Sequence, residues 1–266
     1  MPIACQLKFR NLTQSEFDER DAVVMRCAYA AQNALGRLCD ERVYEYDLAR
    51  RLRAEGFRLV HTRVPVVVSH DGFVKEYRLD LVADHALYEL KTVGAFVSQH
   101  DAQALHYAML ADVNHAKLLN FRTGKVQGRL LFNVLIGGRR RTTSMDAARW
   151  VSLSPECDIL KRRVERLLTD WGGGLDWRLY DEALVHFCGG VDRCTRRVTI
   201  WLDGAELGSH LVNVHAEGVF FLVTSFTNLL EQQRAHICRL LALTRMRAVQ
   251  WINLDHNSVQ LQTIHA

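Results

Sequence analysis

The hydrophobic pattern changes period three times within the first half of the chain, and each change predicts a different kind of element. Thr13 and Glu16 have the spacing of a capping box and predict the start of a helix that ends at Gly36. Asp71-Gly72 predicts a hairpin turn between two segments rich in β-branched residues. The predicted order is helix, helix, three strands, helix and two strands, over residues 14–35, 40–54, 57–69, 74–83, 86–92, 98–111, 116–121 and 126–135.

The second half of the chain repeats this pattern. Residues 66–92 align without gaps with residues 198–224, a displacement of 132 positions at which seven of 27 pairs are identical. Collinear matches in further elements favour an internal duplication over chance similarity of two α/β units. We therefore predict a first domain over 1–138, a polar linker over 139–158 and a repeat of the domain over 159–266.

Three charged residues of the first half fall on one face of the predicted sheet. If Asp84-His85 is a two-residue turn, Asp80 lies directly opposite Glu89, and Lys91 points to the same side as Glu89. Cross-strand carboxylates with Cβ atoms about 4.5–5.5 Å apart repel each other unless a cation lies between them. Oxygen ligands suit Mg²⁺ or Mn²⁺. An ordinary solvated face with salt bridges is the alternative for these three residues.

Additional motifs favour the metal-site interpretation. Asp80, Glu89-Leu90-Lys91 and Gln103-x-x-x-Tyr107 together resemble the PD-(D/E)XK nuclease superfamily and the Q-x-x-x-Y motif of its RecB-like branch. The segments around Gly36 to Tyr44, His100-x-x-Gln103 and Leu119-Asn120-Phe121 resemble more closely the bacterial GxxExxY protein family. This resemblance covers about residues 12–135, and it implies a restriction-endonuclease-like fold, a mixed sheet flanked by helices, here as a tandem duplication.

The resemblance also implies a role for each matching residue. Lys91 is the implied catalytic lysine, Asp80 and Glu89 are implied metal ligands, and Glu41 is a further acid near the metal. Gln103 and Tyr107 are implied to contact substrate or brace the site, and Tyr44 is implied to bind substrate. Two positions depart from the family patterns: Leu79 replaces the proline before the aspartate, and Leu38 replaces the second glycine of GxxExxY.

The gapless alignment places apolar residues at the matching positions of the second half. Val212, Phe221 and Val223 align with the aspartate, glutamate and lysine. A separate local match, of residues 35–44 with residues 171–180, places Trp177 at the position of Glu41. Hydrophobic side chains cannot hold a hard cation. We predict that the second half is a degenerate copy without this chemistry.

Composition sets outer limits on the function. The chain has 266 residues, 48% hydrophobic and 24% charged, with a net charge of +4, and only six of its 34 basic residues are lysine. Arginine suits phosphate contacts, so nucleic acid is an allowed partner. No apolar run reaches the length of a membrane span, which predicts a cytoplasmic protein without a membrane partner. The seven cysteines contain no C-x-x-C pair, so we expect neither zinc nor an iron–sulfur cluster.

We therefore expect a Mg²⁺-dependent nuclease, able to use Mn²⁺, that hydrolyses phosphodiester bonds of DNA with a preference for single strands or ends. The residues do not distinguish DNA from RNA, and they leave open a protein partner or a homodimer. The alternative is a non-catalytic module that keeps the nuclease fold and binds nucleic acid or protein, in a defence system for instance, because folds of this kind are reused for recognition.

Overall fold

The computed structural model describes residues 2–266, which divide into two compact units. Unit 1 ends at Gly137 and unit 2 begins at Gly138. Within the described residues, the strands form two six-stranded sheets, one in each unit. Each sheet is mixed and flanked by helices, which confirms the predicted α/β class and its restriction-endonuclease-like arrangement.

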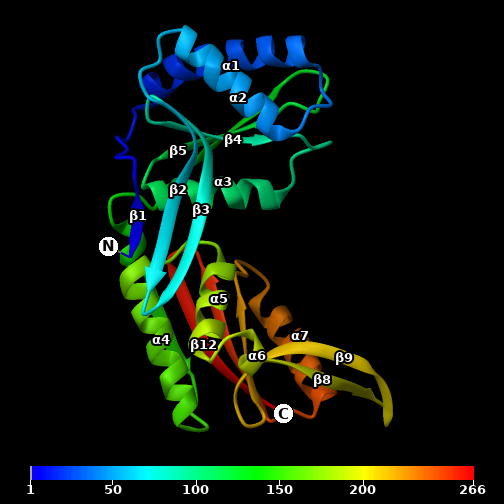
Figure 1. The fold of residues 1–266 in the computed structure, drawn as a ribbon. Helices are drawn as coiled ribbons and strands as arrows, with labels where there is room; N and C mark the ends of the chain where they lie inside the picture. The colour runs from blue at the N-terminus through cyan, green and yellow to red at the C-terminus, as the bar shows by residue number, and fades with distance from the viewer. Residues whose placement is uncertain (1) are drawn as a thin grey trace. The chain divides into compact units, whose positions relative to one another are not determined.

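Unit 1 contains three helices and six strands among its described residues. Its sheet has the order β1-β2-β3-β4-β5-β6, in which β4 and β5 are parallel and the other neighbours are antiparallel (Figure 1). The elements are β1 (Ile3–Cys5), α1 (Gln14–Leu35), α2 (Glu41–Ala54), β2 (Val60–His70), β3 (Phe73–Ala83), β4 (Ala86–Lys91), α3 (Ser98–Ala111), β5 (His115–Asn120) and β6 (Gln127–Phe132).

Local sequence signals account for the ends of several elements. The capping box at Thr13 is confirmed, since the Glu16 carboxylate accepts from the Thr13 backbone N–H at 2.8 Å. Asp84 and His85 both have positive φ, as the tight turn between β3 and β4 requires, and Ala83 pairs with Ala86 as predicted.

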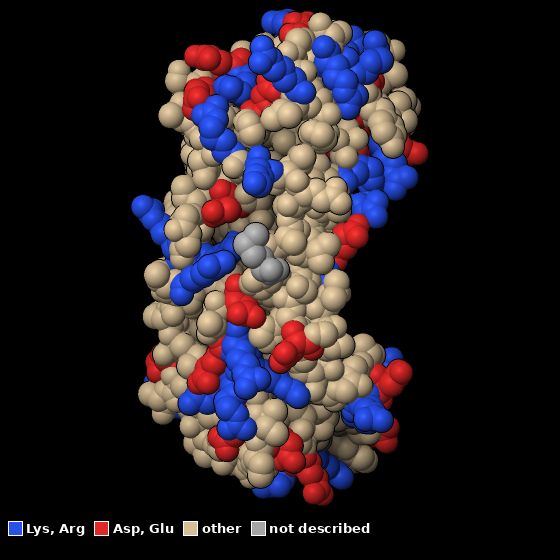
Figure 2. Space-filling model, turned by 60° about the vertical axis from the view of Figure 1, so that its left-hand side comes forward, with Lys and Arg blue, Asp and Glu red and all other residues tan. Residues whose placement is uncertain are grey.

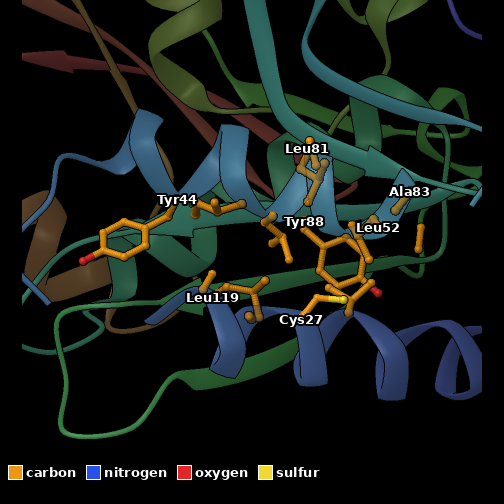
Figure 3. Close-up of a cluster of buried hydrophobic side chains, with 14 of the residues drawn as sticks. Cys27, Tyr44, Leu52, Leu81, Ala83, Tyr88 and Leu119 are labelled. Atoms are coloured by element: carbon orange, nitrogen blue, oxygen red, sulfur yellow. The ribbon is translucent and has the colours of Figure 1, made fainter. Parts of the chain in front are cut away.

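Helices α1 and α2 cover one face of the sheet with a continuous hydrophobic core. Cys27 of α1 and Leu52 of α2 meet Leu81, Tyr88 and Leu119 of the three central strands (Figure 3). All five side chains are at least 96% buried. Since successive strand residues point to opposite faces, the other residues of β3 and β4 face away from this core.

Apart from two additional short helices, unit 2 repeats the order of helices and strands found in unit 1. Its sheet has the order β7-β12-β11-β10-β9-β8, and β10 and β11 form a parallel pair that corresponds to β4 and β5. Strand β7 also pairs in parallel, with β12. The elements are η1 (Arg139–Arg141), β7 (Ser144–Arg149), α4 (Pro155–Trp171), α5 (Trp177–Phe187), α6 (Val191–Cys194), β8 (Thr195–Leu202), β9 (Ala205–Ala216), β10 (Val219–Thr224), α7 (Leu230–Thr244), β11 (Ala248–Asp255) and β12 (Ser258–His265).

Individual contacts recur at equivalent places in the two units. The Tyr44 hydroxyl donates to the Gly36 carbonyl at 2.7 Å, and the Tyr180 hydroxyl donates to the Gly172 carbonyl at 2.6 Å. Both glycines end the first helix of their unit with positive φ. The repetition is therefore present in the five remaining strands and in these local contacts, whereas the first strand of each unit joins the opposite edge of its sheet, β1 beside β2 and β7 beside β12.

A β-bulge at His215 makes the gapless alignment fail within the central strands of unit 2. Ala216 pairs with Val219, but the next pair inward is Val214 with Phe220, so His215 is an extra residue on β9. A bulge of this kind is invisible to an alignment without gaps. Because side chains alternate, a shift of one residue exchanges the two faces of a strand.

The bulge changes which residues correspond across the two units. Counting outward from the paired residues, Leu222 lies opposite Val212, as the glutamate of β4 lies opposite the aspartate of β3 in unit 1. Leu222 and Thr224 therefore occupy the places of the glutamate and the lysine, and the predicted assignment of Phe221 and Val223 is wrong by one position. The assignment of Val212 is unaffected, since it lies on the other side of the bulge.

Residues 139–158 are not the linker that the sequence pattern predicted. The segment contains η1, strand β7 and the first turn of α4. The Arg140 side chain is buried, and its carbonyl accepts from the Gly173 backbone N–H at 2.7 Å. The polar residues of this segment occupy a sheet edge and a turn, where backbone pairing with β12 decides the structure.

Figure 2 shows lysine and arginine side chains interspersed with acidic ones over the face that it displays. In residues 2–266, no helix combines the length and the apolar character that crossing a membrane requires.

Candidate active site

Unit 1 brings the predicted carboxylates and the lysine together at a break in the sheet. The β3–β4 ladder stops at Leu81 and Tyr88, and Asp80 and Glu89 are the next residues outward on the two strands. Beyond the break, the Asp80 carboxylate accepts from the Leu90 backbone N–H at 2.9 Å. The sheet therefore opens at Asp80, where the two strands separate.

The same break is present on the other side of β3. Pairing of β2 with β3 passes from Thr62–Leu81 to Val64–Leu79, and it omits Arg63 and Asp80, which lie opposite each other. Arg63 has a φ of 54°, in the left-handed region that non-glycine residues seldom adopt. Asp80 thus has an arginine on one side and a glutamate on the other.

Lys91 and Glu89 leave the strand on the face opposite to the hydrophobic core. Tyr88 and Leu90 point into that core, so alternation directs Glu89 and Lys91 to the other face. Lys91 Nζ lies 2.7 Å from Glu89 Oε1. The exposed fractions are 8% for Asp80, 2% for Glu89 and 8% for Lys91, so this is a buried charged cluster and not a solvated face.

Helix α2 adds two acidic residues. Glu41 begins the helix, and Glu45 follows one turn later on the same side of it. Glu45 is 1% exposed, and its Oε2 lies 4.0 Å from Arg63 Nη1. Glu41 was predicted from sequence and Glu45 was not, although its four-residue spacing from Glu41 places both on one side of a helix.

Burial and mutual repulsion raise the pKa values of these carboxyl groups. Burial, with the charge of Asp80, raises the pKa of Glu45 to about 7 and raises that of Glu89 well above its ordinary value. The pKa of Glu41 is raised by burial, which outweighs the attraction of Lys91. For Lys91, burial opposes the charged form, but the attraction of Glu89 prevails and raises the pKa. The lysine is therefore a cation at neutral pH.

The Q-x-x-x-Y residues lie on α3. Gln103 Nε2 donates to the Tyr107 hydroxyl at 3.2 Å, and both side chains are half-buried. Burial raises the Tyr107 pKa, and the charge of Glu89 acts in the same direction. Tyr107 thus lies close enough to the acidic cluster for the charge of Glu89 to act on its pKa.

Tyr44 belongs to the core of unit 1 and not to a substrate surface. Its side chain is fully buried and stacks on Phe121, with 4.5 Å between ring centroids. Its hydroxyl donates to the Gly36 carbonyl and accepts from the Cys39 backbone N–H. The predicted substrate contact is wrong for this residue, because its ring packs in the core and its hydroxyl bonds to the turn between α1 and α2.

The charged cluster fits a divalent cation by the chemistry of its donors. Glu89 Oε2 and Glu45 Oε1 are buried and have no hydrogen-bond partner among the described residues. Such buried oxygens are costly unless a cation or a proton neutralises them. Within residues 2–266, no three histidine, cysteine, aspartate or glutamate side chains are grouped closely enough to form a complete ligand set. Asp80 and Glu89, with water and substrate oxygens, are the donors that a hard cation accepts.

Comparison with known families agrees with this geometry. Residues 18–130 match the PD-(D/E)XK nuclease superfamily. The matched range lies inside unit 1 and includes the acidic cluster, Lys91 and the Q-x-x-x-Y residues. No curated protein and no solved structure gives a significant match to the chain. The superfamily match therefore supports a nuclease-like unit 1, and it does not extend to unit 2.

Unit 2 has no equivalent charged cluster among its described residues. Val212 and Leu222 replace the aspartate and the glutamate, and the β8–β9 ladder continues through Arg196–Val212 without a break. Val212 is 6% exposed and packs with Ile237 and Leu241 of α7. An acid persists only on the second helix, where Asp181 occupies the place of Glu45.

Proposed function

We propose that unit 1 hydrolyses phosphodiester bonds of DNA with the help of Mg²⁺, and that it resembles the GxxExxY branch of the superfamily. The single observation that carries the proposal is the buried cluster of Asp80, Glu89 and Lys91 at a break in the sheet. Evolution of a stable fold alone would not favour this cluster, because buried like charges are costly unless a ligand compensates for them. The superfamily match over 18–130 supports the same reaction class.

Each residue of the cluster has a proposed part. Asp80 and Glu89 would hold the cation, which supplies Lewis-acid stabilisation of the charge on the scissile phosphate. Lys91, charged and anchored at 2.7 Å from Glu89, would place a fixed positive charge beside the same phosphate. Glu41 and Glu45 would complete the negative potential, and Tyr107 would contact substrate from α3.

We further propose that unit 2 is a duplicated domain without catalytic activity. Val212, Leu222 and Thr224 supply neither carboxylate nor amine at the positions of Asp80, Glu89 and Lys91. Unit 2 would then stabilise unit 1 or bind a partner without cleaving anything itself.

The test is cleavage by the purified full chain. Linear duplex, closed circular duplex, single-stranded DNA and single-stranded RNA are incubated in Mg²⁺, in Mn²⁺ and in EDTA. We expect DNA cleavage in both cations and none in EDTA. A preparation of Asp80→Asn, purified in parallel, controls for contaminating nucleases. Equal activity of the two preparations, or activity in EDTA, contradicts the proposal.

A further inference from the structure

A second basic residue, Arg63, flanks the charged cluster of unit 1 and has no part in the proposed function. It lies opposite Asp80, on the side away from Glu89, at the point where the β2–β3 ladder omits one pair. Its side chain is 30% exposed, whereas the side chain of Lys91 is 10% exposed. Solvent therefore reaches the guanidinium of Arg63 more readily than the amine of the lysine.

The backbone of Arg63 is held in an unfavourable conformation. Its φ of 54° lies in the left-handed region, where the β-carbon of an L-residue crowds the following carbonyl oxygen. An arginine has no preference for this region, so the surrounding structure has to impose it. Strained residues of this kind cluster at active sites and ligand sites, where the strain directs a side chain that regular strand geometry would place elsewhere.

Unit 2 contains the same residue type at the equivalent place of its sheet. Arg196 pairs with Val212, which takes the place of Asp80, and the ladder through this pair is continuous. Arg196 does not share the positive φ of Arg63, and its guanidinium donates to the Asp192 carbonyl at 2.6 Å. The left-handed backbone is therefore required neither by arginine nor by this place in the sheet. It accompanies the acidic cluster of unit 1.

The guanidinium of Arg63 has donors to spare. Within residues 2–266, the one carboxylate at ion-pair distance is that of Glu45, with 4.0 Å between Arg63 Nη1 and Glu45 Oε2. This separation exceeds the length of a hydrogen bond. Lys91, by contrast, is paired with Glu89 at 2.7 Å. Arg63 is thus the cation of this site whose N–H donors remain available to a ligand.

Glu45 is placed to orient Arg63. The glutamate is 1% exposed, and its Oε1 has no hydrogen-bond partner among the described residues. A buried carboxylate at 4.0 Å attracts the guanidinium and restricts its directions, because the attraction is weakly screened away from water. The guanidinium is therefore held beside the cluster while its donors stay open.

We propose that Arg63 binds a backbone phosphate of the DNA substrate beside the phosphate that is cleaved. The inference rests on the proposed function, since it needs DNA at the site of unit 1. A guanidinium donates two parallel hydrogen bonds to a phosphate, which an ammonium does not do. Glu89 and Lys91 lie on the strand at one side of Asp80. Arg63 lies on the strand at its other side, so it reaches a neighbour of the phosphate at the cation.

The alternative role for Arg63 is that of a counter-ion, which only offsets the negative charge of the acidic residues. A counter-ion would change the stability of unit 1 and its affinity for the cation. It would make no contact with a particular phosphate. The two roles are therefore distinguished by the response of DNA binding to the loss of a single phosphate charge.

The experiment measures DNA binding without cleavage. The parent is the full chain with Lys91→Ala, and a short labelled single-stranded oligonucleotide is titrated with it in Mg²⁺ and followed by fluorescence anisotropy. Adding Arg63→Gln should weaken binding at least about tenfold, the loss expected for one charge-assisted contact. The slope of log Kd against log salt concentration should fall by roughly 0.7, as for one phosphate contact to a single strand. Arg196→Gln, at the equivalent place of unit 2, should change neither quantity.

A neutral linkage identifies the contacted phosphate. Oligonucleotides that contain one methylphosphonate, moved from each linkage to the next, remove one phosphate charge at a time. At one linkage the methylphosphonate should weaken binding by the parent and should not weaken binding by the Arg63→Gln chain, because arginine and phosphate act as a pair. For a counter-ion, the methylphosphonate would have the same effect on both chains at every linkage.

Equal affinity and equal salt slope of the parent and the Arg63→Gln chain overturn the role of Arg63 and leave the proposed function intact. The same methylphosphonate effect on both chains at every linkage overturns it as well. A parent that does not bind DNA contradicts the proposed function, and the role of Arg63 with it. If Arg63→Gln fails to fold, Arg63→Lys decides, since it should keep the salt slope and weaken binding. Unchanged affinity of Arg63→Lys then overturns the proposal.

Discussion

Lys91 Nζ lies 2.7 Å from Glu89 Oε1, and both side chains are buried beside Asp80 at the point where β3 and β4 separate. A strand places these two residues on one face because they are two positions apart. The lysine therefore depends on the strand for its direction and on the glutamate for its charge state.

Lys91→Ala should abolish cleavage, with a loss of at least about 100-fold, as expected when a preorganised charge beside a reacting phosphate is removed. Binding of the cation should persist, because the two carboxylates remain. The measurements are the cleavage rate and a Mn²⁺ titration. Lys125→Ala removes an exposed lysine of the same unit and should retain wild-type activity. A Lys91→Ala protein that cuts at the wild-type rate would refute the nuclease assignment.

Asp80→Asn and Glu89→Gln should lose both the cation and the activity. Each change keeps the size of the side chain and removes one anionic donor from a site that a hard cation requires. Isothermal titration with Mn²⁺ measures the loss of cation binding. The matched control is Asp101→Asn, which removes a carboxylate that forms a partly exposed ion pair with Arg129. Tight cation binding by both variants would show that other residues hold the ion.

Glu45 predicts a pH dependence of stability in EDTA. Its pKa is about 7 in the folded protein, above its ordinary value, because burial and Asp80 disfavour the charge. Between about pH 4.5 and 7 the folded state therefore binds more protons than the unfolded chain, so its stability should increase as the pH falls from 8 to 5.5. Glu45→Gln should reduce this increase, whereas exposed Glu55→Gln should leave it unchanged. Melting temperatures at the two pH values measure the difference, and an unchanged profile in Glu45→Gln contradicts the prediction.

Gln103 and Tyr107 predict the preferred DNA form. They lie one helical turn apart on α3, which is the spacing of the Q-x-x-x-Y motif. The Gln103 side chain also donates to the Tyr107 hydroxyl at 3.2 Å. The branch that this motif resembles works from ends, so linear or single-stranded DNA should be cut faster than closed circles. A time course on matched linear and circular forms of one plasmid checks this. Rapid nicking of relaxed circles, without preference for ends, would contradict it.

The turns and helix ends that local residues determine could be predicted from the sequence. The supposed two-residue turn at Asp84-His85 is present, and counting outward from its paired neighbours places Asp80 opposite Glu89. The capping box at Thr13 and the helix stop at Gly36 follow from equally local rules. These features need only a few neighbouring residues, so a single sequence contains the information.

The failures have tertiary causes. The bulge at His215 leaves no local mark, and it shifted the predicted counterparts in β10 by one residue. Tyr44 has a polar hydroxyl, and only the structure shows that it donates a hydrogen bond to the Gly36 carbonyl. Strand β7 forms because it pairs with the edge of β12, and the polar sequence of residues 144–149 does not indicate this pairing. In each case a distant segment determines the outcome.

The last prediction compares equivalent positions of the two units. Val212→Asp would place a carboxylate among apolar side chains, Ile237 and Leu241 included, at a cost of several kcal/mol, roughly 2–5. It should lower the melting temperature without creating activity. Asp80→Val loses one hydrogen bond from Leu90, worth about 1 kcal/mol, and gains relief of repulsion with Glu89. Its net change in EDTA should be small.

Thermal melts of both variants in EDTA, beside the wild type, decide the comparison. The two changes exchange the same pair of residue types at equivalent places, so each serves as the control for the other. The difference in their melting temperatures then reports which unit contains a polar, cation-dependent pocket and which contains a closed core. If Val212→Asp melts like the wild type while Asp80→Val collapses, the roles of the two units are reversed, and the charged cluster of unit 1 serves its stability and not a reaction.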